Sequence, residues 1–195
     1  MPRQVDEHKS SPMRDLIFVT RSDAKVLETE RILGCTLRRV DLDLPEIQAV
    51  ELEQVVRRKA EDAYQAVGQR PVLVEESGLF LDAWNGLPGA LVRWFEETVG
   101  VEGICRMLDS FGERGATART SVAVHDGSCR VFVGEVRGAI TARPRGANGF
   151  GWDTIFVPSG ATRTFAEMES EEKDRLSMRR MALEALAAAA RQERE

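Results

Sequence analysis

Histidine and cysteine are scarce in this sequence of 195 residues, and their scarcity narrows the chemistry that the chain can perform. The only two histidines are His8, near the N-terminus, and His125, beside a predicted hairpin turn. A zinc site or a Ser-His-Asp triad would have to be built around His125 alone, which argues against both. The three cysteines, Cys35, Cys105 and Cys129, show no CxxC spacing and are expected to be small buried hydrophobic residues in a reducing compartment.

Long apolar runs and an excess of positive charge are also missing. No apolar run approaches the roughly 20 residues that a helix needs to cross a bilayer, and the N-terminal segment lacks the apolar stretch of a secretory signal. We expect a cytoplasmic protein in which residues 1–13 form a mobile tail and residues 14–195 form one domain. The net charge of −5 argues against a nucleic-acid polymer as the main partner. A small polyphosphate needs only a local cluster of Lys and Arg.

Two common phosphate-binding sequences are absent as well. The chain contains no GxxxxGK[ST] loop, and no GxGxxG sequence opens a helix after a strand. P-loop chemistry and a dinucleotide-binding fold are therefore excluded.

The hydrophobic pattern predicts alternating strands and helices, followed by a hairpin around Asp126-Gly127 and a final helix from about Ser170. Strands are predicted over residues 16–20, 40–44, 71–74, 120–125 and 129–136. Helices are predicted from Ser22 to Gly34, over residues 51–67, and around Ile104, Met107, Leu108 and Phe111. This order indicates an α/β fold with a mixed central sheet flanked by helices. The length fits one domain, or one domain with two lobes.

Lys59 falls in the middle of the apolar stripe of the helix predicted over residues 51–67. An ammonium group on a core-facing stripe is costly unless it reaches water or an anion. Two interpretations stay open: a lysine at the edge of the stripe that extends to solvent, or a lysine that binds a buried anion such as a phosphate.

Two adjacent carboxylates, Glu75 and Glu76, follow an apolar strand at the end where ligands bind in α/β sheets. Successive residues of a strand face opposite sides of the sheet, so the two carboxylates should have different roles. One can face a cleft as a metal ligand or base while the other fixes a loop.

Residues 149–153, Gly-Phe-Gly-Trp-Asp, are the most unusual string in the chain. Glycines that alternate with aromatic residues suit neither a helix nor a strand. Such a loop can offer an aromatic face for stacking and a carboxylate for reading the edge of a base. A purely structural loop with buried aromatic side chains is the other interpretation.

Taken together, these strings resemble the inosine triphosphate pyrophosphatase family. The resemblance runs from about Ile17 to Leu186, and its segments occur in the order of the family. The matching segments are FVTRSDAK, VDLDLPEIQ, PVLVEESGLFLDAWNGLPGALVRWF, GFGWDTIF and TFAEMESEEKDRLSMRR. The resemblance implies a cleft between two lobes, Mg²⁺ as cofactor, a homodimer, and hydrolysis of a purine nucleoside triphosphate (of the ITP, dITP or XTP type) to the monophosphate and pyrophosphate.

The resemblance also implies a role for particular residues. Glu76 and Lys59 correspond to catalytic positions, and Glu46 and Glu76 to the carboxylates around the metal. The implied phosphate-binding residues are Thr20, Arg21, Ser22, Lys25, Lys59 and Arg93. The implied base-binding residues are Phe150, Trp152, Asp153, Lys173, Ser177, Met178 and Arg179. In this scheme the base stacks on Phe150, and Glu76 accepts a proton from the attacking water.

The chain departs from the family at three motifs. Thr20-Arg21-Ser22 stands where the family has Thr-Gly-Asn, Glu75-Glu76 where it has Glu-Asp, and Ser177-Met178-Arg179 where it has Ser-His-Arg. Arg21 does not readily adopt the positive φ that glycine allows, but it could supply a new phosphate contact. The extra methylene of Glu76 moves its carboxylate by about 1 Å, which can cost on the order of 100-fold in rate unless the site re-forms around it.

These departures indicate altered specificity rather than neutral drift, and two other hypotheses stay open beside the pyrophosphatase. One is a hydrolase of the same fold that is specialised for an ordinary or modified nucleotide in a biosynthetic pathway. The other is a nucleotide-binding protein without catalysis.

Overall fold

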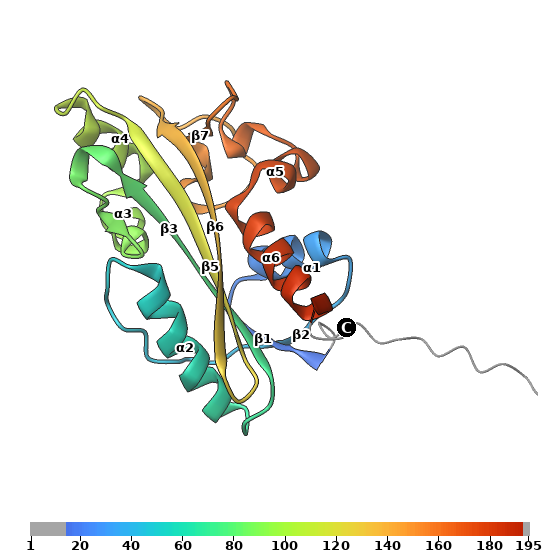
Figure 1. Ribbon diagram of the computed structural model, residues 1–195. Helices are drawn as coiled ribbons and strands as arrows, with labels where there is room; N and C mark the ends of the chain where they lie inside the picture. Colours follow the sequence, from blue (N-terminus) through green and yellow to red (C-terminus); the bar gives the residue numbers. More distant parts are fainter. Residues whose placement is uncertain (1–14, 193–195) are drawn as a thin grey trace, which may run out of the picture.

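The computed structural model describes residues 15–192, and a seven-stranded mixed sheet forms its centre (Figure 1). The strands lie in the order β2-β1-β3-β5-β6-β7, and β4 pairs with the end of β3. Only the β1–β2 and β1–β3 pairs are parallel. The strands are β1 (Ile17–Val19), β2 (Arg38–Val40), β3 (Val72–Leu81), β4 (Pro88–Gly89), β5 (Gly115–His125), β6 (Cys129–Ile140) and β7 (Phe156–Pro158). The predicted α/β fold with a mixed sheet is confirmed.

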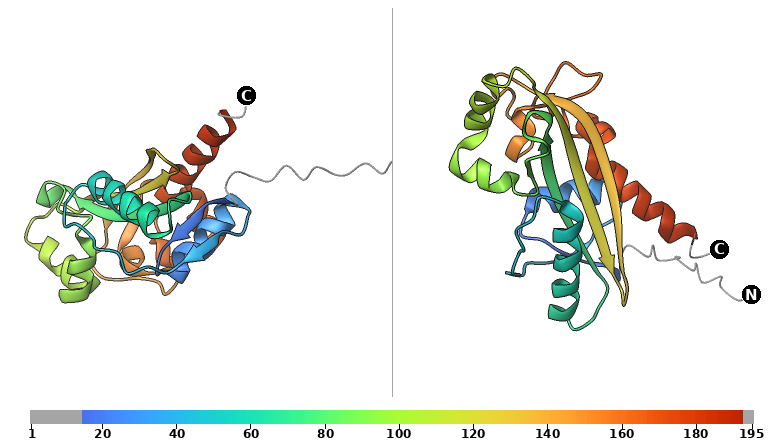
Figure 2. Two further views of the ribbon diagram at one scale, coloured as in Figure 1. Left: turned by 90° about the horizontal axis from the view of Figure 1, so that it is seen from below. Right: turned by 60° about the vertical axis from the view of Figure 1, so that its left-hand side comes forward.

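Helices cover both faces of this sheet, as Figure 2 shows for α2 and α6 on opposite sides of the long β5–β6 hairpin. The α-helices are α1 (Asp23–Leu33), α2 (Leu52–Ala66), α3 (Val92–Thr98), α4 (Gly100–Asp109), α5 (Ser170–Leu176) and α6 (Met178–Gln192). Short 3-10 helices are η2 (Asp82–Trp84), η3 (Gly151–Thr154) and η4 (Phe165–Glu167). The ends of α1 agree with the prediction, because Ser22 accepts a hydrogen bond from the Lys25 N–H and Gly34 adopts the left-handed conformation.

The alternation of β3 separates the two adjacent carboxylates. Val72 and Val74 pack with Val56 of α2 in one hydrophobic cluster. Leu73 packs with Leu183 of α6 in another cluster, on the opposite face. Because the strand continues through residues 75 and 76, Glu75 points toward α1 and α6, and Glu76 points toward α2.

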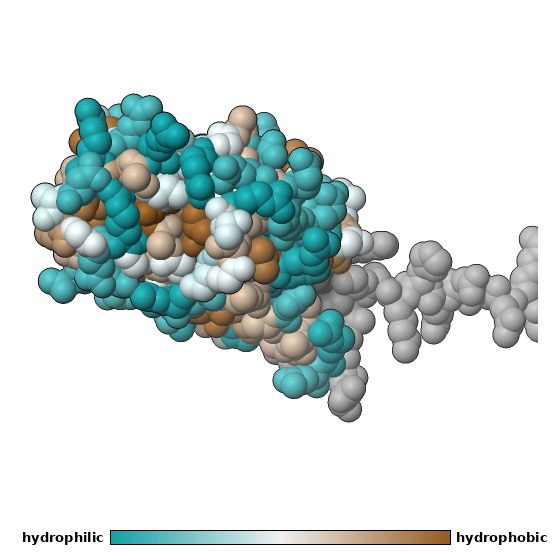
Figure 3. Space-filling view, turned by 90° about the horizontal axis from the view of Figure 1, so that it is seen from above, coloured by the Kyte–Doolittle hydropathy of each residue, from teal (hydrophilic) through white to brown (hydrophobic). Residues whose placement is uncertain are grey.

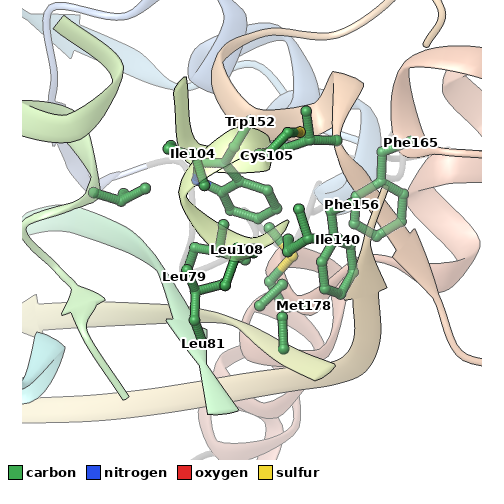
Figure 4. Close-up of a cluster of buried hydrophobic side chains, with 14 of the residues drawn as sticks. Leu79, Leu81, Ile104, Cys105, Leu108, Ile140, Trp152, Phe156, Phe165 and Met178 are labelled. Atoms are coloured by element: carbon green, nitrogen blue, oxygen red, sulfur yellow. The ribbon is translucent and has the colours of Figure 1, made fainter. Parts of the chain in front are cut away.

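A second lobe is built around the far ends of β3, β5 and β6, with α3, α4, η3 and β7 (Figure 1). Its core contains Leu79, Ile104, Trp152 and Phe156, which lie side by side in Figure 4. Seen from above, hydrophobic residues also gather across the middle of the surface, with hydrophilic residues around them (Figure 3). The division into two lobes follows from the placement of three hydrophobic clusters, two on opposite faces of the sheet in the first lobe and one in the second, which the long strands β3, β5 and β6 connect.

Several predicted elements differ from the structure. The strand predicted over residues 71–74 continues to Leu81, so Glu75 and Glu76 lie within β3 and not after its end. The two hairpin strands are also longer than predicted and extend to Gly115 and Ile140.

The strand predicted over residues 40–44 pairs only through Val40, because its partner β1 is three residues long. Leu42 and Leu44 still pack against the core, so the predicted alternation of side chains is confirmed. The predicted strand pairing beyond Val40 is wrong. The single helix predicted from about Ser170 is two helices, because Ser177 adopts an extended conformation and its Oγ accepts a hydrogen bond from the Arg180 N–H.

The tail predicted over residues 1–13 lies outside the described residues. Within residues 15–192, no helix combines the length and the apolar character that crossing a membrane requires.

Gly134 of β6 allows the first turn of α6 to lie directly on the sheet. A Cβ atom at this position would lie 1.9 Å from the Met178 carbonyl oxygen and 2.7 Å from the Ala182 nitrogen. We predict that Gly134→Ala lowers the free energy of unfolding by about 1–3 kcal/mol, because it overpacks this contact. Urea denaturation of the two proteins measures the difference, and an unchanged midpoint would contradict the packing described here.

Candidate active site

A cavity of about 290 Å³ lies between the two lobes and brings together nearly all of the predicted site residues. Both lobes contribute to its wall, from the β1–α1 turn, α2, β3, α5 and α6 on one side and from α3 and η3 on the other. The predicted residues that line it are Thr20, Arg21, Ser22, Lys25, Glu46, Lys59, Glu76, Arg93, Phe150, Trp152, Asp153, Lys173, Met178 and Arg179. Residues that are far apart in the sequence therefore line one cavity.

The turn before α1 offers a helix N-terminus to one end of the cavity. Ser22 caps the helix, and its own N–H donates to the Thr20 hydroxyl oxygen. Arg21 is not among the residues with positive φ, so the turn forms without the conformation that glycine favours. The Arg21 guanidinium donates to Asp43 at 3.0 Å on the exposed side. Free N–H groups and the dipole of this helix favour an anion here.

The Lys59 ammonium on α2 forms an ion pair with the Glu76 carboxylate on β3. Burial disfavours the charge of Lys59, but the carboxylates of Glu76, Glu46 and Glu75 outweigh this effect and raise the pKa of Lys59. The lysine is therefore fully charged at neutral pH. Arg93 lines the same end of the cavity and donates to Glu97 at 2.6 Å.

Arg179 and Glu75 form the most deeply buried ion pair near the cavity. The guanidinium donates to both Glu75 oxygens at 2.7–3.0 Å, and it also donates to Glu28 of α1. The Lys25 ammonium lies 3.4 Å from Glu75. Burial alone would raise the pKa of Glu75, yet the charges of Arg179 and Lys25 outweigh it and lower the pKa to about 2.

Phe150 and the residues after it form an aromatic wall at the other end of the cavity. The Phe150 ring is 37% exposed, and the Lys173 ammonium and the Arg179 guanidinium carbon lie 4.8 and 5.6 Å from its centroid. Asp153 holds the loop in place, because it accepts from the Phe150 N–H and from Lys173 at 2.7 Å. Trp152 is buried and packs edge-on against Phe156.

Ser177 is the one predicted site residue that does not line the cavity. Its side chain is buried and caps α6, as described above. This cap begins the helix that carries Met178 and Arg179 into the wall, so the contribution of Ser177 to the cavity is indirect.

Glu96 was missed by the sequence analysis, although it lines the cavity beside Gly151. It lies one helical turn after the buried Val92 in α3, a spacing that would have placed it on the inward face of this helix. Its Oε1 atom is buried and accepts no hydrogen bond from residues 15–192. Burial, together with the negative charges of Asp153 and Glu97, raises the pKa of Glu96 to about 7.

Two of the cavity carboxylates, Glu46 and Glu76, suit a hard divalent cation. Within residues 15–192 no group of three or more His, Cys, Asp or Glu side chains could hold a metal ion without further ligands. Mg²⁺ is usually held by one or two carboxylates together with substrate phosphates and water, so two carboxylates in a cavity that Lys and Arg side chains also line are compatible with this ion.

Comparison with known proteins gives consistent matches. The model of the Ham1 family matches residues 16–189. The chain is 40% identical over 178 residues to an inosine triphosphate pyrophosphatase of Kluyveromyces lactis, covering 86% of this chain and 91% of that protein. It is 41% identical over 177 residues to a dITP/XTP pyrophosphatase of Methanopyrus kandleri, covering 88% and 94%.

Solved structures agree with these sequence matches. A Ham1 protein from Coxiella burnetii superposes with a TM-score of 0.81 at 25% identity, covering 92% of this chain and 100% of that chain. A nucleoside-triphosphatase / dITP/XTP pyrophosphatase from Mycobacterium abscessus superposes with a TM-score of 0.68 at 32% identity, covering 87% and 97%.

The buried Glu75 carboxylate should make the fold sensitive to acid. Its pKa is lowered from 4.5 to about 2 in the folded protein, so its contribution to stability is present above pH 4.5 and is lost as the pH falls toward 2. We predict that Glu75→Gln lowers the free energy of unfolding by about 3–5 kcal/mol at pH 7, because Arg179 loses its main partner. Denaturant titrations from pH 7 to pH 3 should also show a shallower loss of stability for the variant. A parallel loss in both proteins would contradict this role of Glu75.

Proposed function

The chain belongs to the Ham1 family, and on this premise we propose that it is a pyrophosphatase that converts a purine nucleoside triphosphate to the monophosphate and pyrophosphate. One observation carries the proposal: a single cavity joins a cationic end, with Lys25, Lys59 and Arg93, to an aromatic loop at Phe150. A nucleotide has the same two parts, a polyanion and a flat base. Relatives about 40% identical that carry the names of inosine triphosphate and dITP/XTP pyrophosphatases support the same reaction.

Lys59 and Arg93 at the cationic end are suited to a triphosphate because their partners are not fully buried, whereas Lys25 pairs with the buried Glu75. The partner of Lys59 is Glu76, which lines the cavity, and the partner of Arg93 is Glu97, whose side chain is exposed. A phosphate that carries several negative charges can replace these partners or share them. The N-terminus of α1 adds N–H donors at the same end.

Glu76 is the proposed general base. Its carboxylate lines the cavity and is positioned by Lys59. Glu76 accepts a proton from a water molecule that attacks the α-phosphorus, the α–β phosphoanhydride bond breaks, and pyrophosphate leaves with the bridging oxygen. Mg²⁺, when bound by Glu46, Glu76 and the phosphates, would neutralise charge and lower the pKa of a water molecule.

The base would stack on Phe150, where Lys173 and Arg179 already lie near the ring. These two residues carry N–H donors and no acceptor, so they suit a 6-oxo group and leave a 6-amino group without a partner. This supports an oxopurine such as hypoxanthine or xanthine over adenine. The assignments of Asp153 and Ser177 to the base edge are weaker, because both side chains already serve the backbone of their own loops.

One observation favours a second candidate, a hydrolase of the same fold that is specialised for another nucleotide. Met178 is buried in the cavity wall at the position where the resemblance leads one to expect histidine. An apolar thioether in place of an imidazole changes the hydrogen bonds available to the base. Magnesium dependence, a homodimer and a cytoplasmic location stay predictions.

Glu76→Gln tests the mechanism, because the amide keeps the shape of the side chain but cannot take the proton. We predict a fall in kcat of about 10²–10⁴-fold with inosine triphosphate, and a smaller change in KM. Release of pyrophosphate measures the rate, in a panel of purine nucleoside triphosphates with and without Mg²⁺.

Glu53→Gln on the exposed side of α2 is the matched control and should behave as the unchanged protein. Saturable binding without turnover of any nucleotide would instead establish a binding protein. A preference for inosine or xanthosine triphosphate over guanosine triphosphate of less than tenfold would favour the specialised hydrolase.

A further inference from the structure

Glu96 is a charged residue of the cavity wall that the proposed function leaves without a role. It belongs to α3 and lies three residues after Arg93, so the two side chains share one face of the helix, with Cβ atoms roughly 5–6 Å apart. A Cβ atom on Gly151 would lie 2.7 Å from the Glu96 Oε1 atom, so Glu96 also approaches the loop that carries Phe150. Glu96 therefore lies between the proposed phosphate end and the proposed base end.

The charges around these two residues of α3 support this intermediate position. Arg93 interacts electrostatically with Glu46 and Glu76, the two carboxylates that suit a divalent cation. Glu96 instead experiences the negative charge of Asp153, which belongs to the aromatic loop. One turn of α3 therefore leads from the phosphate end of the cavity to the loop at the base end.

One oxygen of the Glu96 carboxyl group lacks a partner. The Oε1 atom is buried and has no hydrogen-bond partner in residues 15–192. Asp153, the other acid beside this loop, differs because its Oδ2 atom accepts from the Phe150 N–H and from the Lys173 ammonium. A buried acceptor without a partner destabilises a fold, and packing alone gives no reason to keep one. A donor on the bound nucleotide would provide the missing partner.

The direction of the base determines which part of the nucleotide can supply this donor. In the proposed function, the 6-oxo edge of the base faces Lys173 and Arg179, which belong to α5 and α6. In a purine nucleotide the sugar is attached to N9 of the five-membered ring, away from that edge. The sugar therefore extends toward the opposite wall of the cavity, where α3 carries Glu96 (Figure 1).

A sugar hydroxyl suits this carboxyl group better than a group that can only donate or only accept. Burial and the neighbouring carboxylates raise the pKa of Glu96 to about 7, so both of its protonation states are populated near neutral pH. A hydroxyl group can donate to the ionised carboxylate and can accept from the protonated form. The hydrogen bond therefore persists in either state.

We propose that Glu96 is a specificity-determining residue that forms a hydrogen bond with a hydroxyl group of the nucleotide sugar. The proposal rests on the function proposed above and deepens it, because it names the part of the substrate that this side chain recognises. The sugar connects the base to the α-phosphate, so a residue between the two ends of the cavity is placed to contact it. This role does not exclude deoxyribonucleotides, because 2′-deoxyribose keeps the 3′-hydroxyl group.

The test is a cycle that combines removal of the carboxylate with removal of one sugar hydroxyl. Inosine triphosphate is compared with its 2′-deoxy and 3′-deoxy analogues in the unchanged protein and in Glu96→Leu, at about pH 8, where the ionised carboxylate predominates. We expect loss of the contacted hydroxyl to lower kcat/KM at least about tenfold in the unchanged protein and less than about threefold in the variant. The analogue that shows this difference identifies the hydroxyl that Glu96 binds.

Glu102→Leu, which removes an exposed carboxylate from α4, is the control and should show the same losses as the unchanged protein. Each loss is a ratio within one protein, so a change in the folded fraction cancels. If both analogues lose the same factor in Glu96→Leu as in the unchanged protein, the proposal is overturned.

Calorimetric binding of inosine monophosphate and its two deoxy analogues provides the same comparison without turnover. If the unchanged protein releases no pyrophosphate, the proposed function fails. The binding comparison then still decides whether Glu96 contacts the sugar.

Discussion

The buried guanidinium of Arg179 is the constraint on which the cavity depends. It joins Glu75 of β3 to Glu28 of α1, and it lies near the Phe150 ring. Three cations, Lys25, Lys173 and Arg179, face three carboxylates, Glu28, Glu75 and Asp153, so the network carries no net charge. Buried charges persist only when they are paired and hydrogen-bonded in this way. The network therefore fixes the relative positions of a strand, three helices and the aromatic loop.

This constraint divides the cavity into two chemically different ends. At the base end, Lys173 and Arg179 are held by carboxylates that are almost fully buried, so their positions are set before any ligand enters. At the proposed phosphate end, Lys59 pairs with Glu76 of the cavity wall and Arg93 pairs with the exposed Glu97, so neither cation is held by a fully buried carboxylate. In the proposed function, preorganised donors would provide specificity for the base at one end, and exchangeable ion pairs would bind the phosphates at the other.

The sequence predicted those parts of the site that follow from local periodicity. The opposite directions of Glu75 and Glu76 follow from the strand. The place of Lys59 on an apolar stripe left two interpretations open, solvent or an anion, and the structure shows an anion partner. The anion proved to be Glu76 of the protein itself, which the spacing could not show. The positions of Ser177 and Glu96 in the structure were harder to predict. The cap that Ser177 forms interrupts a continuous helical pattern, and Glu96 on a short helix reaches the cavity only because the two lobes pack together.

The departures from the family motifs are accommodated by the surrounding structure rather than left as defects. Arg21 avoids a positive φ and pairs with Asp43, while Ser22 caps α1. The longer side chain of Glu76 contacts Lys59, so the carboxylate is held in the cavity despite the added methylene. A site that had lost its function would have no reason to keep each substituted side chain paired or capped. These compensations argue that the proposed phosphate end is preserved although two of the three departures lie there, while the third, Met178, lines the wall at the proposed base end.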